Sequence, residues 1–476
     1  MSKIVLRPYQ DEANKKTVNW LSDSKTDGKS GLVVMPVAAG KSILIAKAVE
    51  HAKSLGYGVI ILQPSVELLL QNYDKYIRVG GEATIYSASA GIKEMSLTTY
   101  VTLGSVKKLA SQFLSLTKKW VFIMDEAHFS FSPTEGSMFK QFEKEIKPVK
   151  VVGYTATPFI LKRNGMEGDT MLNIMTRVRP RVFTDFIHVE QVSSMIKGNY
   201  WAPLKFVEYA FDEGLLRFNS TGSEYTEESI QSANAAMGVN NNIYKDALRI
   251  CEENPKAKVL IFMDSVDNAA KMHKALSKKL KSGVVAGETT KSIRSGLVEE
   301  FSNGDLQVLI NYGVFTTGFD APSMTHVLIG RPTNSFSLFY QIQGRVVRLH
   351  PLGLDATVVD YCGNIKRFGK IEELIIADFE EYGWGATSGG FLLTKVPVGS
   401  RVSLEQVIAD SKKNPRNVGA KTGDGTKIPF GKFAGKELNS PSVNLGYLRW
   451  MHKECNLINY PMFKEALEKY LEVQGK

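Results

Sequence analysis

The feature of this sequence that most constrains its fold is an alternation of short apolar runs with amphipathic stretches. The run at residues 31–37 is followed by apolar residues at helical spacing, and the run at 58–62 by a helix predicted over 67–76. Continuous apolar runs separated by helices predict a parallel sheet that helices cover on both faces. The runs of this first series lie at residues 31–37, 58–62, 83–86, 97–101, 120–124 and 149–154.

The alternation stops and then resumes in a second series. Residues 160–245 carry mixed signals that are typical of loops and short elements, and residues 383–390 have the glycine-rich composition of a linker. We therefore expect an α/β protein with two tandem domains and a small C-terminal domain. The runs of the second series lie at residues 258–263, 283–286, 307–311, 325–329 and 356–360. The predicted divisions are 1–160, a connecting region with the start of the second domain at 161–245, then 246–375 and 376–476.

Composition narrows the class of protein only a little. The chain has 59 Lys and Arg against 49 Asp and Glu, a net charge of +10 that suits either a polyanionic partner or plain solubility. Its three cysteines, Cys251, Cys362 and Cys455, are too far apart for a disulfide framework or a cysteine-based zinc site. No apolar run approaches the roughly 18 residues of a spanning helix, and the first residues lack a secretory signal. We expect a cytoplasmic protein without membrane contact or structural zinc.

A short glycine-containing turn follows the first apolar run. Residues 38–42 read AAGKS between a predicted strand and a predicted helix, where backbone N–H groups and a helix N-terminus can face phosphates. Lys41 would reach the β- and γ-phosphates, and the Ser42 hydroxyl would bind Mg²⁺. Ala38, Ala39 and Gly40 would supply the backbone around an ATP molecule.

Two adjacent carboxylates end the apolar run at 120–124. Adjacent charges at a buried strand end suit a nucleotide hydrolase better than a structural turn. Asp125 would hold Mg²⁺ through water, and Glu126 would orient and deprotonate the attacking water. His128 is expected to link the nucleotide to the second domain. Thr155 and Thr157 end the next run, either as a simple threonine-rich turn or as two hydroxyls that relay the state of the nucleotide.

The order GKS, DEAH, TATP resembles the superfamily 2 helicases. The resemblance implies two RecA-like domains that use ATP and Mg²⁺. The segment LRPYQ is similar to the family's adenine-reading segment, which implies that Gln10, with Arg7, binds ATP. Segments 61–72 and 98–106 stand where the family contacts the nucleic-acid backbone, and the residues implied are Pro64, Ser65, Thr102 and Ser105.

Two segments of the second half continue the resemblance. Residues 314–322 (VFTTGFDAP) resemble the segment that couples nucleic acid to nucleotide, and residues 341–348 match the family's Q-x-x-G-R-x-x-R. Arg345 and Arg348, three apart on a predicted helix, would share a face and neutralise the transferring phosphate, the alternative being a solvated basic face. The implied roles are Thr316 for nucleic acid, Thr317 for coupling, and Gly318, Asp320 and Gln341 for ATP.

Within the superfamily the chain looks most like the RadD-type and type III restriction-translocase branch, and also like phage branch-migration helicases of the UvsW kind. Two departures stand out. Ala38 replaces a glycine of many relatives at a position that often needs an unusual φ. The cysteine-rich zinc module of RadD-type proteins is missing from the sequence.

The last hundred residues lie outside this resemblance. Residues 411–436 contain seven Lys and Arg against one acidic residue, with Phe430 and Phe433 beside Lys432. Such a segment suits phosphate contact with base stacking, and a flexible charged linker is the alternative. Tyr447, Leu448 and Trp450 are expected to form a small core.

The function expected from these features is that of an ATP-dependent DNA helicase or translocase of phage type, in a bacterial or phage-infected cytoplasm. It would remodel branched or forked DNA and single/double-strand junctions in recombination, repair or replication, and the expected protein partners are those of recombination or replication. The alternatives are an RNA helicase, a translocase subunit of a restriction complex that needs a nuclease partner, and a non-enzymatic binding protein on an inactive motor fold.

Overall fold

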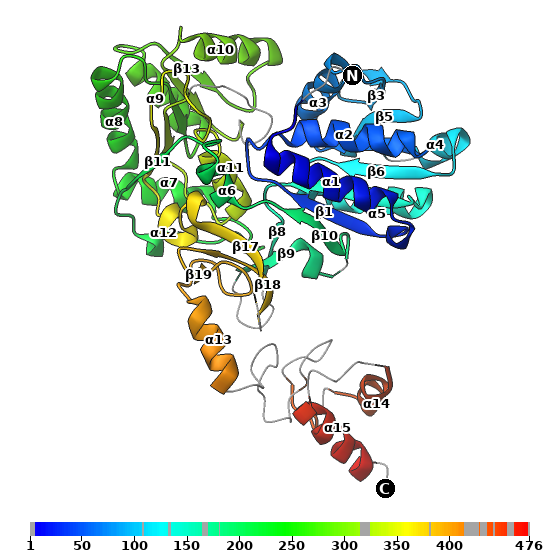
Figure 1. The fold of residues 1–476 in the computed structure, drawn as a ribbon. Coiled ribbons are helices and arrows are strands. Elements are labelled where there is room, and N and C mark those ends of the chain that lie inside the picture. Colours follow the sequence, from blue (N-terminus) through cyan, green and yellow to red (C-terminus); the bar gives the residue numbers. More distant parts are fainter. Residues whose placement is uncertain are drawn as a thin grey trace.

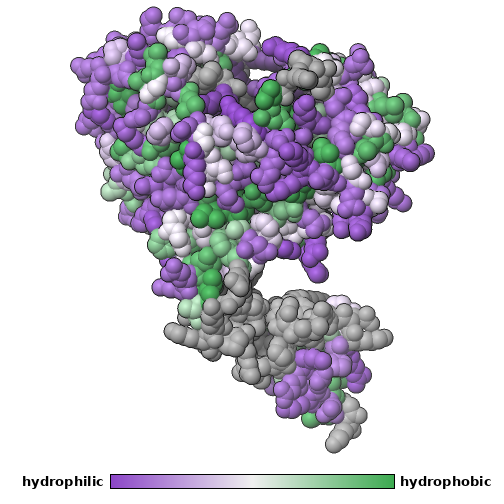
Figure 2. All heavy atoms as spheres, in the orientation of Figure 1, coloured by the Kyte–Doolittle hydropathy of each residue, from purple (hydrophilic) through white to green (hydrophobic). Residues whose placement is uncertain are grey.

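Two α/β domains lie side by side, with a separate helical tail (Figure 1). The structure is a computed structural model of the 476-residue chain. It describes residues 5–106, 109–131, 135–163, 170–179, 181–314, 324–379, 382–413, 428, 436–440, 443–454 and 461–474. None of the helices within these ranges is long and apolar enough to cross a membrane. The face of the two domains seen in Figure 2 is mostly hydrophilic.

The first domain is built on an eight-stranded sheet of order β10-β1-β7-β6-β2-β5-β3-β4, parallel except for β4. Successive residues of a strand point to opposite faces, so Ile123 packs in one core and Phe122 in the other. Both faces are covered, which explains the continuous apolar runs of the sequence. The strands are β1 (Ser30–Val34), β2 (Gly58–Gln63), β3 (Thr84–Ser87), β4 (Ile92–Lys93), β5 (Thr98–Thr102), β6 (Trp120–Met124), β7 (Lys150–Thr155) and β10 (Asp185–Val189).

Five helices cover these two faces. Buried residues of α1, α2 and α3 belong to the core on one side of the sheet, and those of α4 and α5 to the core on the other. The helices are α1 (Pro8–Ser22), α2 (Lys41–Ser54), α3 (Val66–Arg78), α4 (Ala110–Leu116) and α5 (Glu135–Ile146). The predicted α/β architecture is therefore confirmed for the first half of the chain.

The second domain has a six-stranded parallel sheet of order β11-β16-β15-β12-β14-β13. The second apolar series supplies five of its strands, as predicted. The strands are β11 (Leu204–Glu208), β12 (Val259–Phe262), β13 (Ser282–Val285), β14 (Val308–Asn311), β15 (His326–Ile329) and β16 (Ala356–Asp360). The helices are α7 (Glu227–Ala236), α8 (Val239–Glu253), α9 (Val266–Leu276), α10 (Lys291–Asn303), α11 (Phe336–Gln343) and α12 (Asn364–Phe368).

Residues 161–245 contribute to both domains. Strand β10 pairs in parallel with β1 of the first sheet, and β11 pairs in parallel with β16 of the second. A hairpin of β8 (Phe159–Arg163) and β9 (Thr170–Ile174), and the short helix α6 (Val192–Lys197), complete the region. The strand that this region adds to the first sheet was not predicted from the sequence.

The glycine-rich segment 383–390 is not a linker, and that prediction was wrong. It contains β18 (Gly383–Ser388), which pairs along its whole length with β17 (Leu374–Phe379) and then with β19 (Phe391–Leu392). Trp384 packs on Phe186 of β10 with ring centroids 4.3 Å apart. These contacts tie the small sheet to the first domain, because an aromatic side chain can anchor a strand that is otherwise poor in apolar side chains.

The tail begins with α13 (Leu404–Lys413) and ends with α14 (Leu445–Glu454) and α15 (Pro461–Gln474). In Figure 1 the last two helices lie away from the α/β domains. They share a small core that includes Leu448, Met451, Phe463 and Leu467. Leu448 is buried as predicted, but Trp450 is 52% exposed, so its assignment to the core was wrong.

Candidate functional site

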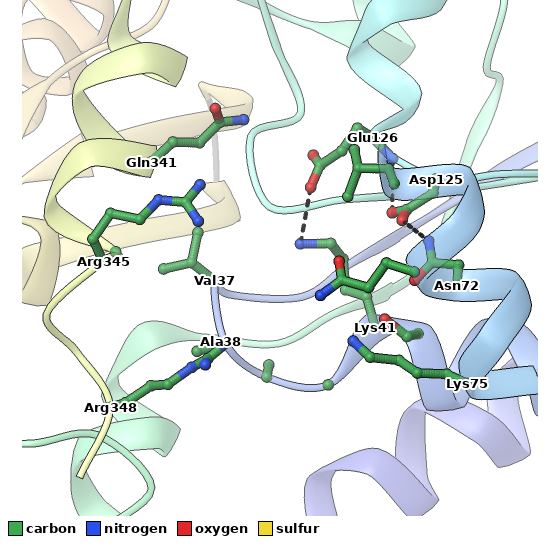
Figure 3. A pocket seen from close by; sticks show the side chains of 16 residues that line it. Val37, Ala38, Lys41, Asn72, Lys75, Asp125, Glu126, Gln341, Arg345 and Arg348 are labelled. Atoms are coloured by element: carbon green, nitrogen blue, oxygen red, sulfur yellow. Dashed lines mark hydrogen bonds and ion pairs between the residues drawn. The ribbon is translucent and has the colours of Figure 1, made fainter. Parts of the chain in front are cut away.

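One pocket lies between the two α/β domains and is lined by both (Figure 3). The first domain contributes the loop before α2, one side of α3 and the end of β6, and the second contributes the end of α11 and the turn after it. The lining residues are Val37, Ala38, Ala39, Gly40, Lys41, Ser42, Leu68, Gln71, Asn72, Lys75, Asp125, Glu126, Gln341, Gly344, Arg345 and Arg348.

The loop between β1 and α2 has the geometry of an anion site. Gly40 takes the N-cap position of α2 with φ 83°, and no side chain caps the helix. The first N–H groups of α2 therefore point to the pocket end without a side-chain acceptor, which favours phosphate oxygens there. Ala38 has φ 57°, the left-handed conformation that glycine adopts without cost. The unusual φ suspected from the sequence is present, and alanine tolerates it.

Residues near the N-terminus form hydrogen bonds to this loop. The amide Nε2 of Gln10 donates to Ala39 O at 2.9 Å, the Tyr9 hydroxyl donates to the same oxygen at 3.2 Å, and Gln10 Oε1 accepts from Arg7 N at 3.0 Å. The Arg7 guanidinium lies 5.0 Å from the ring centre of Tyr200. Gln10 and Arg7 thus adjoin the loop without lining the pocket, and an adenine contact by them stays a prediction.

The two carboxylates follow the end of β6, and each is held by hydrogen bonds. Asp125 Oδ2 accepts from Asn72 Nδ2 at 2.7 Å, and Asp125 Oδ1 accepts from Glu126 N at 2.9 Å. Burial and the neighbouring Glu126 raise the pKa of Asp125, against the opposing effect of Lys41. Asp125 is thus a buried carboxylate, fixed by two hydrogen bonds in the lining of the pocket.

Glu126 is the better placed of the two to accept a proton. Burial would raise its pKa, but Lys41 Nζ at 3.3 Å, together with His128 and Arg345, holds that pKa below its ordinary value. Its Oε2 is buried and has no hydrogen-bond partner among the described residues. An ionised carboxylate oxygen with a free lone pair in a polar pocket suits a general base for water.

The residues predicted to hold Mg²⁺ fit that ion. Ser42 and Asp125 line the same pocket and offer a hydroxyl and a carboxylate, the oxygen ligands that Mg²⁺ prefers. Both Asp125 oxygens already accept one hydrogen bond, and each keeps capacity for a metal-bound water. Elsewhere in the described ranges, no group of three or more His, Cys, Asp or Glu side chains forms a further metal site.

Three of the four residues predicted to couple nucleotide and domain movement lie together. His128 Nδ1 is 3.1 Å from Thr155 Oγ1 and 3.5 Å from Thr157 Oγ1 and Glu126 Oε2. Burial lowers the pKa of His128, and the neighbouring Glu126 acts against that shift. The end of β7 is therefore connected to Glu126 through one imidazole.

Both arginines line the pocket, but the argument that placed them on one helix face was wrong. Helix α11 ends at Gln343, so Arg345 and Arg348 lie in the turn beyond it. Burial lowers the pKa of both guanidinium groups, that of Arg345 to about 10, and both stay charged at neutral pH. Figure 3 shows the two side chains reaching from the second domain into the pocket.

The residues predicted to touch nucleic acid lie at the carboxyl ends of neighbouring strands. Pro64 and Ser65 follow β2, and Ser65 caps α3 by accepting from Leu68 N. Thr102 ends β5, 2.8 Å from the hydroxyl of Ser105. These positions share one edge of the sheet with Asp125. The remaining predicted residues, Thr316, Thr317, Gly318, Asp320 and Lys432, lie outside the described residues.

Sequence reasoning missed the part of α3 that lines the pocket. Asn72 donates to both Asp125 Oδ2 and Gln63 Oε1, and Gln71 and Lys75 line the pocket beside it. Asn72 and Lys75 are three residues apart on a helix that the sequence predicted, so their shared face was a usable signal. The resemblance assigned segment 61–72 as a whole to nucleic acid, and Asn72 was therefore not predicted to line the pocket.

Fold and site together show two RecA-like α/β domains with one shared pocket between them. Two family models match the chain: "Type III restriction enzyme, res subunit" over residues 3–160, and "Helicase conserved C-terminal domain" over residues 241–350. Each match falls on one α/β domain. Together the two models cover both α/β domains, which agrees with the resemblance to superfamily 2 helicases.

Individual relatives agree with that family. The "Putative ATP-dependent helicase IRC3" of Saccharomyces cerevisiae is 23% identical over 75% of this chain and 52% of that protein. The "ATP-dependent DNA helicase uvsW" of Enterobacteria phage T4 is 23% identical over 68% of this chain and 64% of its own length. This chain therefore spans only about half to two thirds of these two relatives.

A solved structure shares the fold. The "ATP-dependent Type ISP restriction-modification enzyme LlaBIII bound to DNA" superposes with a TM-score of 0.56 at 15% identity. The match covers 75% of this chain and 27% of that enzyme, so it concerns the fold of the motor part alone.

Proposed function

We propose that this protein is an ATP-dependent DNA helicase or translocase that remodels branched or forked DNA. The observation that carries the ATPase part is the single pocket in which Lys41 and Glu126 of one domain face Arg345 and Arg348 of the other. A phosphate-binding loop, a buried general base and cations from a second domain are together the requirements for hydrolysing a nucleoside triphosphate.

The chemistry divides among these residues. Lys41 and the N–H groups at the start of α2 bind the phosphates, and Arg345 and Arg348 neutralise charge that develops during transfer. Glu126 accepts the proton of the attacking water through Oε2, which accepts no hydrogen bond from the described residues. Mg²⁺ bound by Ser42 and Asp125 would add charge neutralisation at the phosphates. Asn72 keeps the Asp125 carboxylate oriented.

DNA is the proposed partner because of the relatives. The T4 relative is named a DNA helicase, and the LlaBIII enzyme is bound to DNA in its structure. Branched or forked DNA in recombination, repair or replication is the finer part of the proposal. The test is ATP turnover and strand separation measured on forks, Holliday junctions, single strands and RNA duplexes. Stronger stimulation by RNA duplexes than by any DNA would overturn it in favour of an RNA helicase.

A second candidate function is that of a translocase subunit in a restriction complex. The likeness to the type III restriction family model and to the LlaBIII fold favours it. Such a subunit would move along duplex DNA without separating strands, and it would need a nuclease partner. Displacement of a third strand from a triplex, without unwinding of a fork, would support this candidate over the first.

The lysine-rich segment 411–436 is proposed to increase the affinity for DNA. Each phosphate neutralised steepens the dependence of log affinity on log salt by about 0.9. Replacing Lys412, Lys413, Lys421 and Lys427 by Gln should weaken fork binding and flatten this slope. A matched loss of four charges on the second domain, at the exposed Lys271, Lys274, Lys278 and Lys279, is the control. Equal affinity and slope in the tail variant and wild type would make the segment a solvated linker.

The strands before the tail show where a tail deletion can be made. A chain that ends near residue 377 would be cut inside β17, which pairs with β18. A chain that ends at Ser403 keeps β17, β18 and β19 together, including the bridge from Phe391 to Ser403. The latter deletion tests the tail without breaking the motor.

A further inference from the structure

Residues 198–203, between α6 and β11, form the segment that joins the two domains, called here the joining segment. It places a buried tryptophan against the phosphate-binding loop. Trp201 lies between α6 and β11 and is 3% exposed. Its indole Nε1 donates to Val37 O at 3.2 Å. Val37 lines the pocket and directly precedes the strained Ala38, so the joining segment is bonded to the loop at its entrance.

The next residue of the same segment is bonded to the second domain. Ala202 N donates to Val347 O at 2.8 Å. Val347 lies between Arg345 and Arg348 and is fully buried, so its position fixes the backbone that carries both arginines. Two consecutive residues of the joining segment therefore contact the loop of one domain and the arginine segment of the other.

Direct packing reinforces this connection. A Cβ placed on Gly344 would come within 2.5 Å of the Val37 side chain, so the arginine segment already lies close against the loop. On the other side, the Tyr200 ring packs edge-on against Tyr9 with centroids 4.8 Å apart, and the Tyr9 hydroxyl donates to Ala39 O. The joining segment thus contacts the carbonyl of Val37 directly, through Trp201, and the carbonyl of Ala39 indirectly, through Tyr9.

We propose that Trp201 is a positioning residue that sets the arginine segment relative to the phosphate-binding loop. A phosphate that draws in the backbone of residues 37–40 moves Val37 O, and the indole bond passes that movement to Ala202 and from there to Val347. Occupancy of the loop is in this way coupled to placement of Arg345 and Arg348. The inference rests on the proposed ATP hydrolysis.

The first test removes the indole donor and keeps a ring. Trp201→Phe should lower kcat roughly two- to tenfold, the range expected for one net hydrogen bond, with little change in ATP affinity. Trp120→Phe is the matched control, because Trp120 is also fully buried and its Nε1 donates to a backbone carbonyl, Thr117 O, at 2.9 Å at the far end of β6. A purely structural Trp201 would lower the unfolding temperature as the control does and leave kcat at the control's value.

The second test asks whether Trp201 acts through the arginines. In a double-mutant cycle with Arg345→Lys, the loss of kcat in the double variant should fall short of the product of the two single losses. Losses that multiply would overturn the proposal. Should Trp201→Phe fold poorly, benzothienylalanine at position 201 keeps the bicyclic shape and removes only the N–H, and the same outcomes apply. Before these tests, the wild-type protein must show ATP turnover that Lys41→Ala abolishes. Without that result, the proposed function is rejected, and the role of Trp201 is not what has failed.

Discussion

The two α/β domains bring unlike groups to the pocket between them. The first supplies the loop, both carboxylates and Lys41, and these are held by contacts within that domain, such as Asn72 to Asp125 and Lys41 to Glu126. The second supplies Gln341 and two arginines from the end of α11 and the turn beyond it. Under the proposed function, this difference means that the first domain can bind phosphate before the domains close, whereas the second adds charge that depends on closure.

The largest expected effect is on the first domain. Lys41→Ala should abolish ATP turnover and weaken nucleotide binding, because the β- and γ-phosphates lose their main charge from that domain. Turnover, nucleotide affinity and unfolding temperature are measured together. A well-folded variant with wild-type turnover would contradict the comparison, since binding would then not reside in the first domain.

Changes in the second domain should separate turnover from binding. Arg345→Ala and Arg348→Ala are each expected to lower kcat by orders of magnitude, toward the roughly 10³–10⁵ known for arginine fingers in GTPases. ATP and DNA affinity should change little, because the proposed target is charge in the transition state. An arginine variant that hydrolyses ATP normally but fails to hold DNA would assign that residue to the nucleic-acid path.

Within the first domain, Glu126 should behave unlike Lys41. Glu126→Gln keeps the size of the side chain but cannot take a proton from water, so hydrolysis should fall by about 10²–10⁴ while ATP stays bound. The variant should accumulate as an ATP- and DNA-bound complex. If nucleotide affinity fell together with turnover, Glu126 would instead serve binding, through its contact with Lys41 at 3.3 Å.

The sequence predicted the fold of both domains and most of the pocket because those features are local. Apolar periodicity marks each strand, and the loop and carboxylates directly follow strands whose carboxyl ends share an edge. It did not reveal β18, which lacks an apolar run and depends on Trp384 packing against Phe186, or the contact of Trp201 with Val37. Contacts between residues more than a hundred positions apart leave no periodic pattern in one sequence.

The helix expected for Arg345 and Arg348 failed for a related reason. The shared face assumed a helix through this segment, yet α11 ends at Gln343, and the chain then turns with Val346 and Val347 fully buried. Both valines belong to the buried core, and the sequence alone does not show which core contacts fix this turn. Both arginines still reach the pocket, so the predicted function of the motif did not depend on the predicted helix.

The smallest expected effect concerns strain in the loop of the first domain. Ala38 has φ 57°, a conformation that costs a non-glycine residue about 1–2 kcal/mol. Ala38→Gly relieves that cost but adds about 0.4–1 kcal/mol of chain entropy in the unfolded state. The net gain in the free energy of unfolding should therefore lie between about zero and 1.6 kcal/mol, a rise of no more than about 3–6 °C in unfolding temperature for a domain of this size. Ala38→Val, whose branched side chain tolerates this φ poorly, is the matched variant and should destabilise the first domain.

If the loop is already organised before closure, as the comparison of the two domains holds, Ala38→Gly should leave ATP affinity close to that of wild type. A large loss of ATP affinity in the glycine variant would show that the Ala38 side chain itself keeps the loop in its binding conformation. The loop would then not be organised by the rest of the first domain.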